Sequence, residues 1–178
     1  MSFREFFKKD NSALKKHMIS SALINKKMVS GESLTPDEEE HVNSVSKAIK
    51  SSGKTKKAQV LYSGIGFHPH KMNLTDDGTH YHMHLPAFTS ATEDYDTAEH
   101  FSRSFYDKEK DRPQKQILKL HIPRGSHGIH VQNDVNSHEK EFLIHHGAKI
   151  KIRKEPEQIN HYTQLWHADL VHDGIKDL

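Results

Sequence analysis

Two glutamates separated by a single residue, Glu139 and Glu141, are the side chains of this sequence best suited to chemistry. Successive side chains of a β-strand point to opposite faces, so both carboxylates point the same way if the strand begins at or before Glu139. Phe142 and Ile144 then point the other way, into a core. Of two carboxylates on one face, one can bind a cationic group while the other accepts a proton beside it. An isolated pair is also typical of a solvated strand end, so its meaning depends on the motifs upstream.

The composition is that of a polar protein with enough residues for one hydrophobic core. Of the 178 residues, 33% are hydrophobic and 28% are charged. No apolar run approaches the roughly 20 residues that a membrane span needs, and the N-terminus lacks the apolar segment of a signal peptide. Cysteine is absent, which excludes disulfides, a thiol nucleophile and a Cys-ligated metal. We expect a cytoplasmic protein with no membrane partner, and the net charge of +2 requires no nucleic-acid partner.

The first fifty-odd residues predict a helical lobe. Residues 3–29 carry an apolar stripe with helical spacing, and residues 30–33 interrupt it. The run Thr35-Pro36-Asp37-Glu38 is a strong helix start, with Thr as N-cap, Pro at the first helical position and Glu at the reciprocal capping position. We assign residues 1–53 to an N-terminal helical lobe and residues 54–178 to a core, together one compact domain.

Strand patterns dominate after residue 58. Four segments have the character of strands or extended chain: residues 59–64, 85–90, 116–122 and 162–171. Between them we expect a loop over residues 66–84, a helix that includes Ala98, Phe101 and Phe105, and a loop up to residue 138. The strand of Glu141 then continues into a hairpin, with His145 and His146 solvated in its turn. Helices collected at the N-terminus and strands joined by irregular loops indicate an α+β fold.

Three of these segments together resemble mono-ADP-ribosyltransferases of the arginine–serine–glutamate class. That family has an aromatic-Arg-Gly strand, a Ser-Thr-Ser strand followed by a helix with Ala-x-x-Phe, and Glu-x-Glu before a hairpin with a Gly turn. The matching segments here are Leu61-Tyr62-Ser63-Gly64, Phe88-Thr89-Ser90-Ala91-Thr92 and Glu139-Lys140-Glu141. The resemblance runs from about residue 58 to residue 152, and it is greatest to the enzymes of T4-like phages. It implies two small packed sheets around an NAD cleft.

The resemblance also assigns catalytic roles to individual residues. Glu141 matches the glutamate that stabilises the oxocarbenium-like centre as nicotinamide leaves, which is stabilisation of charge that develops in the transition state. Glu139 matches the acid that orients and deprotonates an acceptor guanidinium, because an arginine is fully protonated in water. Ser90 matches the first serine of Ser-Thr-Ser, which positions Glu141.

Further residues match the family's NAD-binding positions. Thr92 matches the last serine of Ser-Thr-Ser, Phe101 the aromatic that packs on nicotinamide, and Gly64 the glycine whose backbone meets the nicotinamide amide. Tyr62 matches the aromatic of the first strand, although it could equally be a core tyrosine. Residues 126–138 match the loop that recognises the acceptor.

One position departs from the family pattern. The first-strand arginine that binds the NAD phosphates corresponds here to Ser63, and serine cannot replace a bidentate cation. Another cation could take over this role, and the candidates in the sequence are Arg103, Arg124, Lys71 and a charged His68. The alternatives are weak NAD binding and an inactive domain.

The 17 histidines are the compositional peculiarity of the chain. His80, His82 and His84 would share one face of an extended segment, with His68 and His70 nearby, and metal ligands use such spacing. No carboxylate has a convincing ligand spacing, and the family needs no metal. We therefore expect a polar loop and no metal site, with a His-rich metal-binding protein as the least favoured alternative.

The sequence thus predicts an NAD-dependent mono-ADP-ribosyltransferase that modifies a protein side chain, arginine by preference, and uses NAD as co-substrate. The resemblance implies a host protein as acceptor, such as a polymerase or the translation machinery, and action in the host cytoplasm. A degenerate NAD-cleft module that binds a partner without catalysis is the main alternative.

Overall fold

The computed structural model describes residues 22–66, 69, 74–102, 104–107, 112–132 and 140–175. Most of the helix expected over residues 3–29 lies outside them, but residues 22–30 are helical. The helix α2 (Pro36–Ser51) begins as predicted: the Thr35 side chain accepts a hydrogen bond from the Glu38 N–H, and the Glu38 carboxylate accepts one from the Thr35 N–H. Lys27 Nζ lies 2.8 Å from Glu38 Oε1 and ties the two helical segments together.

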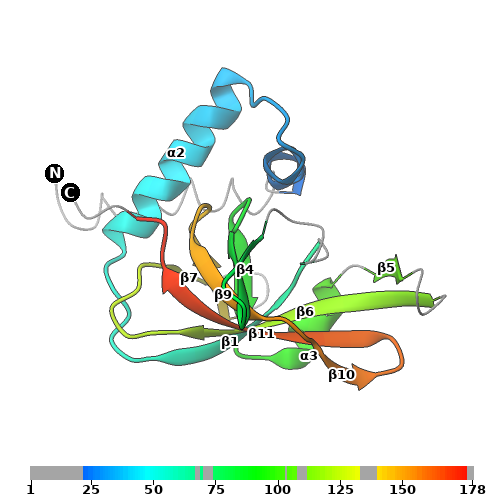
Figure 1. Ribbon diagram of the computed structural model, residues 1–178. Coiled ribbons are helices and arrows are strands. Elements are labelled where there is room, and N and C mark those ends of the chain that lie inside the picture. The colour runs from blue at the N-terminus through cyan, green and yellow to red at the C-terminus, as the bar shows by residue number, and fades with distance from the viewer. Residues whose placement is uncertain are drawn as a thin grey trace, which may run out of the picture.

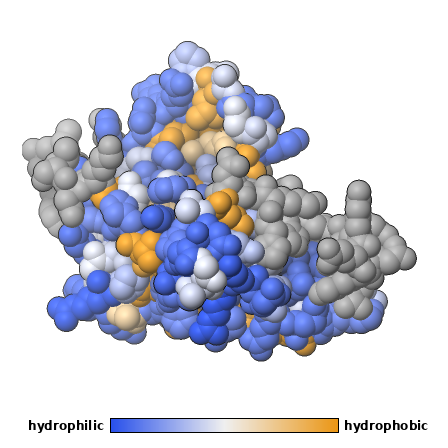
Figure 2. Space-filling view, in the orientation of Figure 1, coloured by the Kyte–Doolittle hydropathy of each residue, from blue (hydrophilic) through white to orange (hydrophobic). Residues whose placement is uncertain are grey.

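The two helical segments lie on one side of a large sheet, and the short helix α3 (Tyr95–Phe101) lies on another side of it (Figure 1). Val45 and Ile49 of α2 are fully buried, in one cluster with Ile24, Phe88 and Leu143. In Figure 2, hydrophobic atoms come to the surface between the two helical segments, whereas the surface over the sheet below is mostly hydrophilic. Among the described residues, no helix is both long and apolar enough to cross a membrane.

All the strands in the described part of the chain belong to one mixed sheet. Nine of them follow the order β2-β3-β9-β11-β6-β1-β4-β8-β7, while β10 pairs with β11 and β5 with β6. Only the pair β11–β6 is parallel among the paired strands of the described chain. The strands are β1 (Gln59–Gly64), β2 (Thr75–Asp76), β3 (His80–His84), β4 (Thr89–Thr92), β5 (Ser104–Asp107), β6 (Arg112–Ile122), β7 (Ile129–Gln132), β8 (Lys140–Ile144), β9 (Lys149–Arg153), β10 (Glu157–Asn160) and β11 (Thr163–His172).

This sheet folds over on itself around the main core. Residues 85–88 alone connect β3 to β4, and residues 145–148 alone connect β8 to β9, although four or more strands separate the members of each pair in the sheet order. Such short connections require the two ends of the sheet to face each other. One cluster of buried side chains accordingly joins Phe142 and Ala91 to Ile150 and Trp166. The two expected sheets are thus two layers of one continuous sheet, and the α+β prediction is confirmed.

Several predicted boundaries are wrong. The segment 66–84, expected as a loop, contains β2 and β3, and the loop expected up to residue 138 contains β7. The helix expected to include Phe105 ends at Phe101, because Ser102 is extended and residues 104–107 form β5. The strand β10 has four exposed residues and therefore no hydrophobic alternation that a sequence pattern could reveal.

Candidate active site

Ser90, Thr92 and Glu141 lie on one face of two neighbouring strands. In the antiparallel pair β4–β8, Thr92 is opposite Glu141 and Ser90 is opposite Leu143, so these four side chains share a face. The Ser90 hydroxyl donates a hydrogen bond to Oε1 of Glu141, a diagonal contact between the strands. Phe142, between Glu141 and Leu143, points to the other face and is 1% exposed. The structure therefore unites two of the three predicted catalytic residues and anchors their strand in the core.

Ser63 lies next to this group, but its side chain points to the opposite face. Tyr62 of β1 is opposite Thr92, so Tyr62 shares the face of Glu141 and Ser63 does not. Ser63 is 3% exposed, and its hydroxyl donates a hydrogen bond of 2.6 Å to the backbone carbonyl of Ser90. Ser63 thus contacts the main chain that carries Ser90 rather than the face of Glu141.

The glycine after Ser63 allows α3 to approach β1 closely. A Cβ atom on Gly64 would lie 2.3 Å from the carbonyl oxygen of Ala98 and 2.5 Å from the amide nitrogen of Ser102. Both contacts are far below any distance seen for real Cβ atoms, and both involve backbone. Any larger residue at position 64 would therefore push the end of α3 away. Phe101, the last residue of α3, is 62% exposed and presents its ring to solvent beside this contact.

The start of α3 is fixed by polar groups of the β4–α3 turn. Asp94 is the N-cap and accepts hydrogen bonds from the Asp96 N–H at 3.0 Å and from the Thr97 hydroxyl at 2.7 Å. The Thr97 hydroxyl is the main reason that the pKa of Asp94 is lowered. Thr92 accepts a hydrogen bond of 3.1 Å from the Asp94 N–H. Thr92 therefore links the strand of Ser90 to the helix that ends at Phe101.

A family model described as ADP-ribosyltransferase exoenzyme matches residues 5–173. The chain belongs to this ADP-ribosyltransferase exoenzyme family. A comparison with curated proteins found no significant match. ADP-ribosyltransferases use NAD as co-substrate.

Several solved structures share the fold. Exoenzyme S of Pseudomonas aeruginosa, in complex with human 14-3-3 protein beta and carba-NAD, is similar with a TM-score of 0.68 and 17% identity, over 91% of this chain and 73% of that one. The Vis ADP-ribosyltransferase of Vibrio splendidus, in complex with agmatine, gives 0.64 and 17% over 92% and 74%. An ADP-ribosyltransferase toxin of Paenibacillus larvae gives 0.62 and 16% over 95% and 100%. These similarities confirm the predicted ADP-ribosyltransferase fold.

Two residues that the sequence analysis did not predict, Tyr95 and Lys119, lie beside the site. Tyr95 packs its ring edge-on against Tyr62 at 5.5 Å, and its buried hydroxyl has no hydrogen-bond partner among the described residues. Burial, with the carboxylates of Glu99 and Asp96 nearby, raises the pKa of Tyr95. Lys119 of β6 is opposite Tyr62 and shares the face of Thr92, so it is a cation on the same side of the sheet. An isolated tyrosine and a polar position of an alternating strand give no signal in a sequence.

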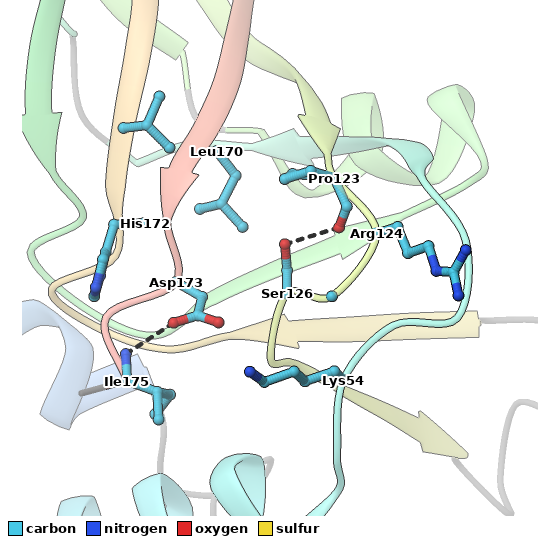
Figure 3. A pocket seen from close by; sticks show the side chains of 10 residues that line it. Lys54, Pro123, Arg124, Ser126, Leu170, His172, Asp173 and Ile175 are labelled. Atoms are coloured by element: carbon cyan, nitrogen blue, oxygen red, sulfur yellow. Dashed lines mark hydrogen bonds between the residues drawn. The ribbon is translucent and has the colours of Figure 1, made fainter. Parts of the chain in front are cut away.

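The structure describes only some of the remaining candidate residues. Glu139 and the proposed cations Arg103, Lys71 and His68 lie outside the described residues. Arg124 is described, in the loop between β6 and β7, where it lines a cavity together with Lys54 and Asp173 (Figure 3). Neither Ser90 nor Glu141 lines this cavity or a second one along β1 and β11. Arg124 is therefore not placed beside Ser90 and Glu141 by either cavity.

The cavity in Figure 3 is bordered by the segment that follows β11. Asp173 accepts hydrogen bonds from the backbone N–H of His127 at 2.8 Å and of Ile175 at 3.0 Å, and its carboxylate lies 2.9 Å from His127 Nδ1. Burial alone would raise the pKa of Asp173, but these hydrogen bonds outweigh burial and lower it. Asp173 is therefore a structural carboxylate that fastens the C-terminal segment to the loop before β7.

Several of the described histidines have structural partners. His82 Nε2 lies 2.8 Å from Asp77, and His84 Nδ1 lies 3.1 Å from the carbonyl oxygen of Gly147. Within the described residues, no group of three or more His, Cys, Asp or Glu could hold a metal ion. The expectation of a solvated His145 is wrong: it is 8% exposed, and its Nε2 lies 2.9 Å from the Ser46 hydroxyl of α2. Burial, with the neighbouring His146, lowers the pKa of His145 to about 4.

Proposed function

We propose that this protein transfers ADP-ribose from NAD to the guanidinium group of a protein arginine and releases nicotinamide. The observation that carries the proposal is the hydrogen bond from Ser90 to Glu141 on one face of the pair β4–β8, with Thr92 opposite Glu141. The serine holds the carboxylate by a charge-assisted hydrogen bond and leaves its second oxygen available to a substrate. Gly64 admits the end of α3, and Phe101 at that end exposes its ring to a substrate in this proposal.

The chemical step needs one bond broken and one bond formed. The bond between the ribose anomeric carbon and the nicotinamide nitrogen breaks, and its electron pair leaves with nicotinamide. Positive charge then builds up on the ribose, and the carboxylate of Glu141 stabilises it. A guanidinium nitrogen of the acceptor attacks the anomeric carbon and loses a proton, which Glu139 accepts in this proposal. The product guanidinium regains its usual charge, so one proton is released per transfer.

The choice of arginine rests on Glu139 and on one structural relative. An acceptor guanidinium is protonated in water, so a nearby carboxylate is needed to make it a nucleophile. The Vis ADP-ribosyltransferase, which shares this fold, was solved with agmatine, a small guanidinium compound. A glutamate two residues before the catalytic position fits the same kind of acceptor here.

The proposed acceptor is a host protein. Exoenzyme S was solved in complex with a human protein, 14-3-3 beta, which supports a protein partner for members of this fold. The resemblance to enzymes of T4-like phages extends the proposal to a phage protein of the arginine–serine–glutamate class that acts in the host cytoplasm. A polymerase or a component of the translation machinery is the proposed class of target.

A non-catalytic NAD-cleft module is a second candidate, and Ser63 is the observation that favours it. Ser63 replaces the family's phosphate-binding arginine, and its buried hydroxyl is already engaged with the Ser90 carbonyl. A protein that had lost phosphate binding could keep the fold and still bind a partner. The presence of both Glu139 and Glu141 favours the enzyme, because a module without catalysis has no need for the second acid.

Incubation with labelled NAD and a host lysate tests the two candidates. The enzyme should label one or a few proteins, and mass spectrometry should place ADP-ribose on arginine. Glu141→Gln should abolish the label. If NAD binds to the protein but neither the lysate nor agmatine is labelled, the non-catalytic module is the better description.

A further inference from the structure

Two cavities adjoin at the end of the sheet where β6 and β11 finish and β1 begins. The first has a volume of about 230 Å³ and the second one of about 380 Å³, and Pro123 and Leu170 line both. Figure 3 shows these two residues on one side of the first cavity and Lys54 on the opposite side. We call the joint depression the strand-end groove and define it by the residues that line either cavity.

Hydrogen bonds fix the two segments that border the strand-end groove. The N–H of Thr55 donates to the carbonyl oxygen of Ser126 at 2.8 Å, and the Gly125 N–H donates to the Thr55 carbonyl oxygen at 2.9 Å. The Thr55 hydroxyl donates to the Pro123 carbonyl oxygen and accepts from the Ser126 N–H, both at 3.1 Å. The rim of the groove is therefore shaped before any partner binds, which lowers the entropy cost of binding.

Apolar side chains are open to solvent in this groove. Val60 is 38% exposed and Val171 is 49% exposed, and Ala58 and Pro123 are exposed as well. A single exposed valine is ordinary on a protein surface. Four apolar side chains that line adjoining cavities form a patch, and covering this patch with a partner would be favourable.

Lysine and arginine side chains border the apolar patch. Arg124 lines the first cavity, and Lys56 and Lys57 belong to the segment that runs from Lys54 in the first cavity to Ala58 in the second. Arg124, Lys56 and Lys57 are all exposed. Lysine and arginine are charged at neutral pH, so the positive charge here does not depend on the protonation of a histidine.

The carboxylates that line the groove in the described part of the chain are Asp169 and Asp173. Asp173 already accepts hydrogen bonds from the backbone N–H groups of His127 and Ile175, and it lies 2.9 Å from His127 Nδ1. Its charge is therefore balanced within the protein. Asp169 is then one exposed carboxylate against three exposed cations, and the groove keeps an excess of positive charge.

The groove is continuous with the candidate active site along β1. Val60 and Tyr62 share a face of this strand, and Tyr62 is opposite Thr92, which is opposite Glu141. The rise per residue and the spacing of strands give a path of roughly 16 Å along the sheet from Val60 to Glu141. About five residues of an extended chain span this distance. One polypeptide segment can thus reach both places.

We propose that the strand-end groove binds an acidic segment with apolar side chains in the acceptor protein, about five residues away from the arginine that receives ADP-ribose. The excess positive charge favours carboxylates, and the exposed valines favour apolar side chains. A nucleic-acid backbone offers the negative charge without the apolar groups. The role in acceptor recognition rests on the proposed function, whereas the binding of such a segment does not.

A fluorescent peptide without arginine tests the binding. The peptide alternates glutamate and leucine, and a matched peptide has lysine in place of every glutamate. Fluorescence anisotropy with the whole protein at neutral pH and about 0.1 M salt should show at least about ten-fold tighter binding of the glutamate peptide. Equal binding of the two peptides, or no binding of the glutamate peptide, would overturn the proposal.

Two matched double variants locate the bound peptide. Lys56→Glu, Lys57→Glu reverses two charges beside the groove, and Lys26→Glu, Lys47→Glu reverses two at exposed positions of the helical lobe. Only the first should weaken binding, by about ten-fold or more. Val60→Ser should weaken it as well, because an apolar contact is lost. Equal losses in both double variants, or tighter binding of an oligonucleotide than of the glutamate peptide at the same salt, would contradict a groove for an acidic segment.

Labelling of defined acceptors connects the groove to transfer. An arginine joined to the glutamate–leucine stretch by about five glycine and serine residues should have a higher kcat/KM than agmatine. Lys56→Glu, Lys57→Glu should remove this advantage and still label agmatine at the wild-type rate. Labelling of agmatine without an advantage of the peptide would refute the acceptor site and leave the proposed function intact. Absence of agmatine labelling would refute the proposed function, and the anisotropy would still decide whether the groove binds the segment.

Discussion

The hydroxyl of Ser63 donates a 2.6 Å hydrogen bond to the backbone carbonyl of Ser90. Ser90 in turn donates a hydrogen bond from its own hydroxyl to Glu141. Ser63 is therefore connected to the proposed catalytic carboxylate through the strand β4. This connection gives Ser63 a supporting role that does not require contact with NAD.

The Ser63 contact can be tested by removing its hydroxyl. Ser63→Ala should cost about 1 kcal/mol of unfolding free energy, because one buried hydrogen bond is lost. It should also lower the turnover number more than it raises the Michaelis constant for NAD, because the Ser63 side chain points away from the face of Glu141. Ser63→Thr, which keeps the hydroxyl, is the matched control. A change in the Michaelis constant alone would mean that Ser63 contacts the co-substrate.

The close approach of β1 and α3 predicts a strong effect at Gly64. Gly64→Ala should lower the melting temperature and the affinity for NAD together, because the new Cβ would collide with the backbone of Ala98 and Ser102 and displace α3. Gly31→Ala is a suitable control, since its Cβ meets no atom within 4 Å and only its positive φ is unfavourable. Calorimetry of both variants, free and with NAD, measures the two effects. Gly64→Ala with wild-type stability would show that α3 does not pack here as described.

The separate roles proposed for Glu139 and Glu141 can be tested by a substitution of Glu139. Glu139→Gln should abolish transfer to arginine or agmatine, because no carboxylate would remain to take the guanidinium proton. The slow hydrolysis of NAD by water should largely persist, because Glu141 still stabilises the developing charge. Both rates can be measured in parallel by nicotinamide release and by labelling of agmatine. An equal fall of both rates would refute separate roles.

The buried His145 should make the folded protein less stable at acidic pH. Its folded pKa of about 4 lies below the value near 6.5 of an exposed histidine, so the unfolded chain binds the proton more readily. The free energy of unfolding should therefore fall as the pH decreases from about 6.5 to 4, by at most roughly 3 kcal/mol, and this contribution should level off below pH 4. Asp173, whose pKa is lowered, adds a loss only below about pH 4.

Chemical denaturation between pH 7 and 4 checks this dependence. His145→Gln should flatten the profile, whereas His121→Gln, at an exposed position, should leave it unchanged. Because His145 lies 2.9 Å from Ser46 of α2, Ser46→Ala should also weaken the attachment of the helical lobe at pH 7. A profile of the His145→Gln variant that coincides with the wild type would exclude this histidine as the cause.

The parts of the fold that follow local rules could be predicted from the sequence. Thr35 and Glu38 form the capping box that their spacing indicates, and Phe142 and Ile144 are buried as their alternation requires. The pairing of Ser90 with Glu141 came from the resemblance to a family, since the two residues are 51 positions apart. Trp166, which lies in the core, donates its ring N–H to Gln116, 50 positions away.

Other features depend on long-range contacts that no local pattern encodes. The direction of Ser63 follows from the register of β1 with β4, and a shift of one residue would reverse it. His145 has the sequence surroundings of a solvated turn, but α2 covers it. His80, His82 and His84 alternate as a strand should, yet the turn formers around them indicate a loop. Their strand is formed by pairing with β2 and β9.

The most direct test of the proposed function is the rate of nicotinamide release from NAD by the wild type and by Glu141→Gln, with and without agmatine. We predict that Glu141→Gln lowers both the hydrolysis and the transfer rate by about 10² to 10³, which corresponds to roughly 3–4 kcal/mol of lost transition-state stabilisation. Thermal unfolding should stay close to that of the wild type, because Glu141 is only half-buried, and Glu155→Gln, at an exposed position, should retain full activity. Wild-type turnover in the folded Glu141→Gln protein would contradict the account.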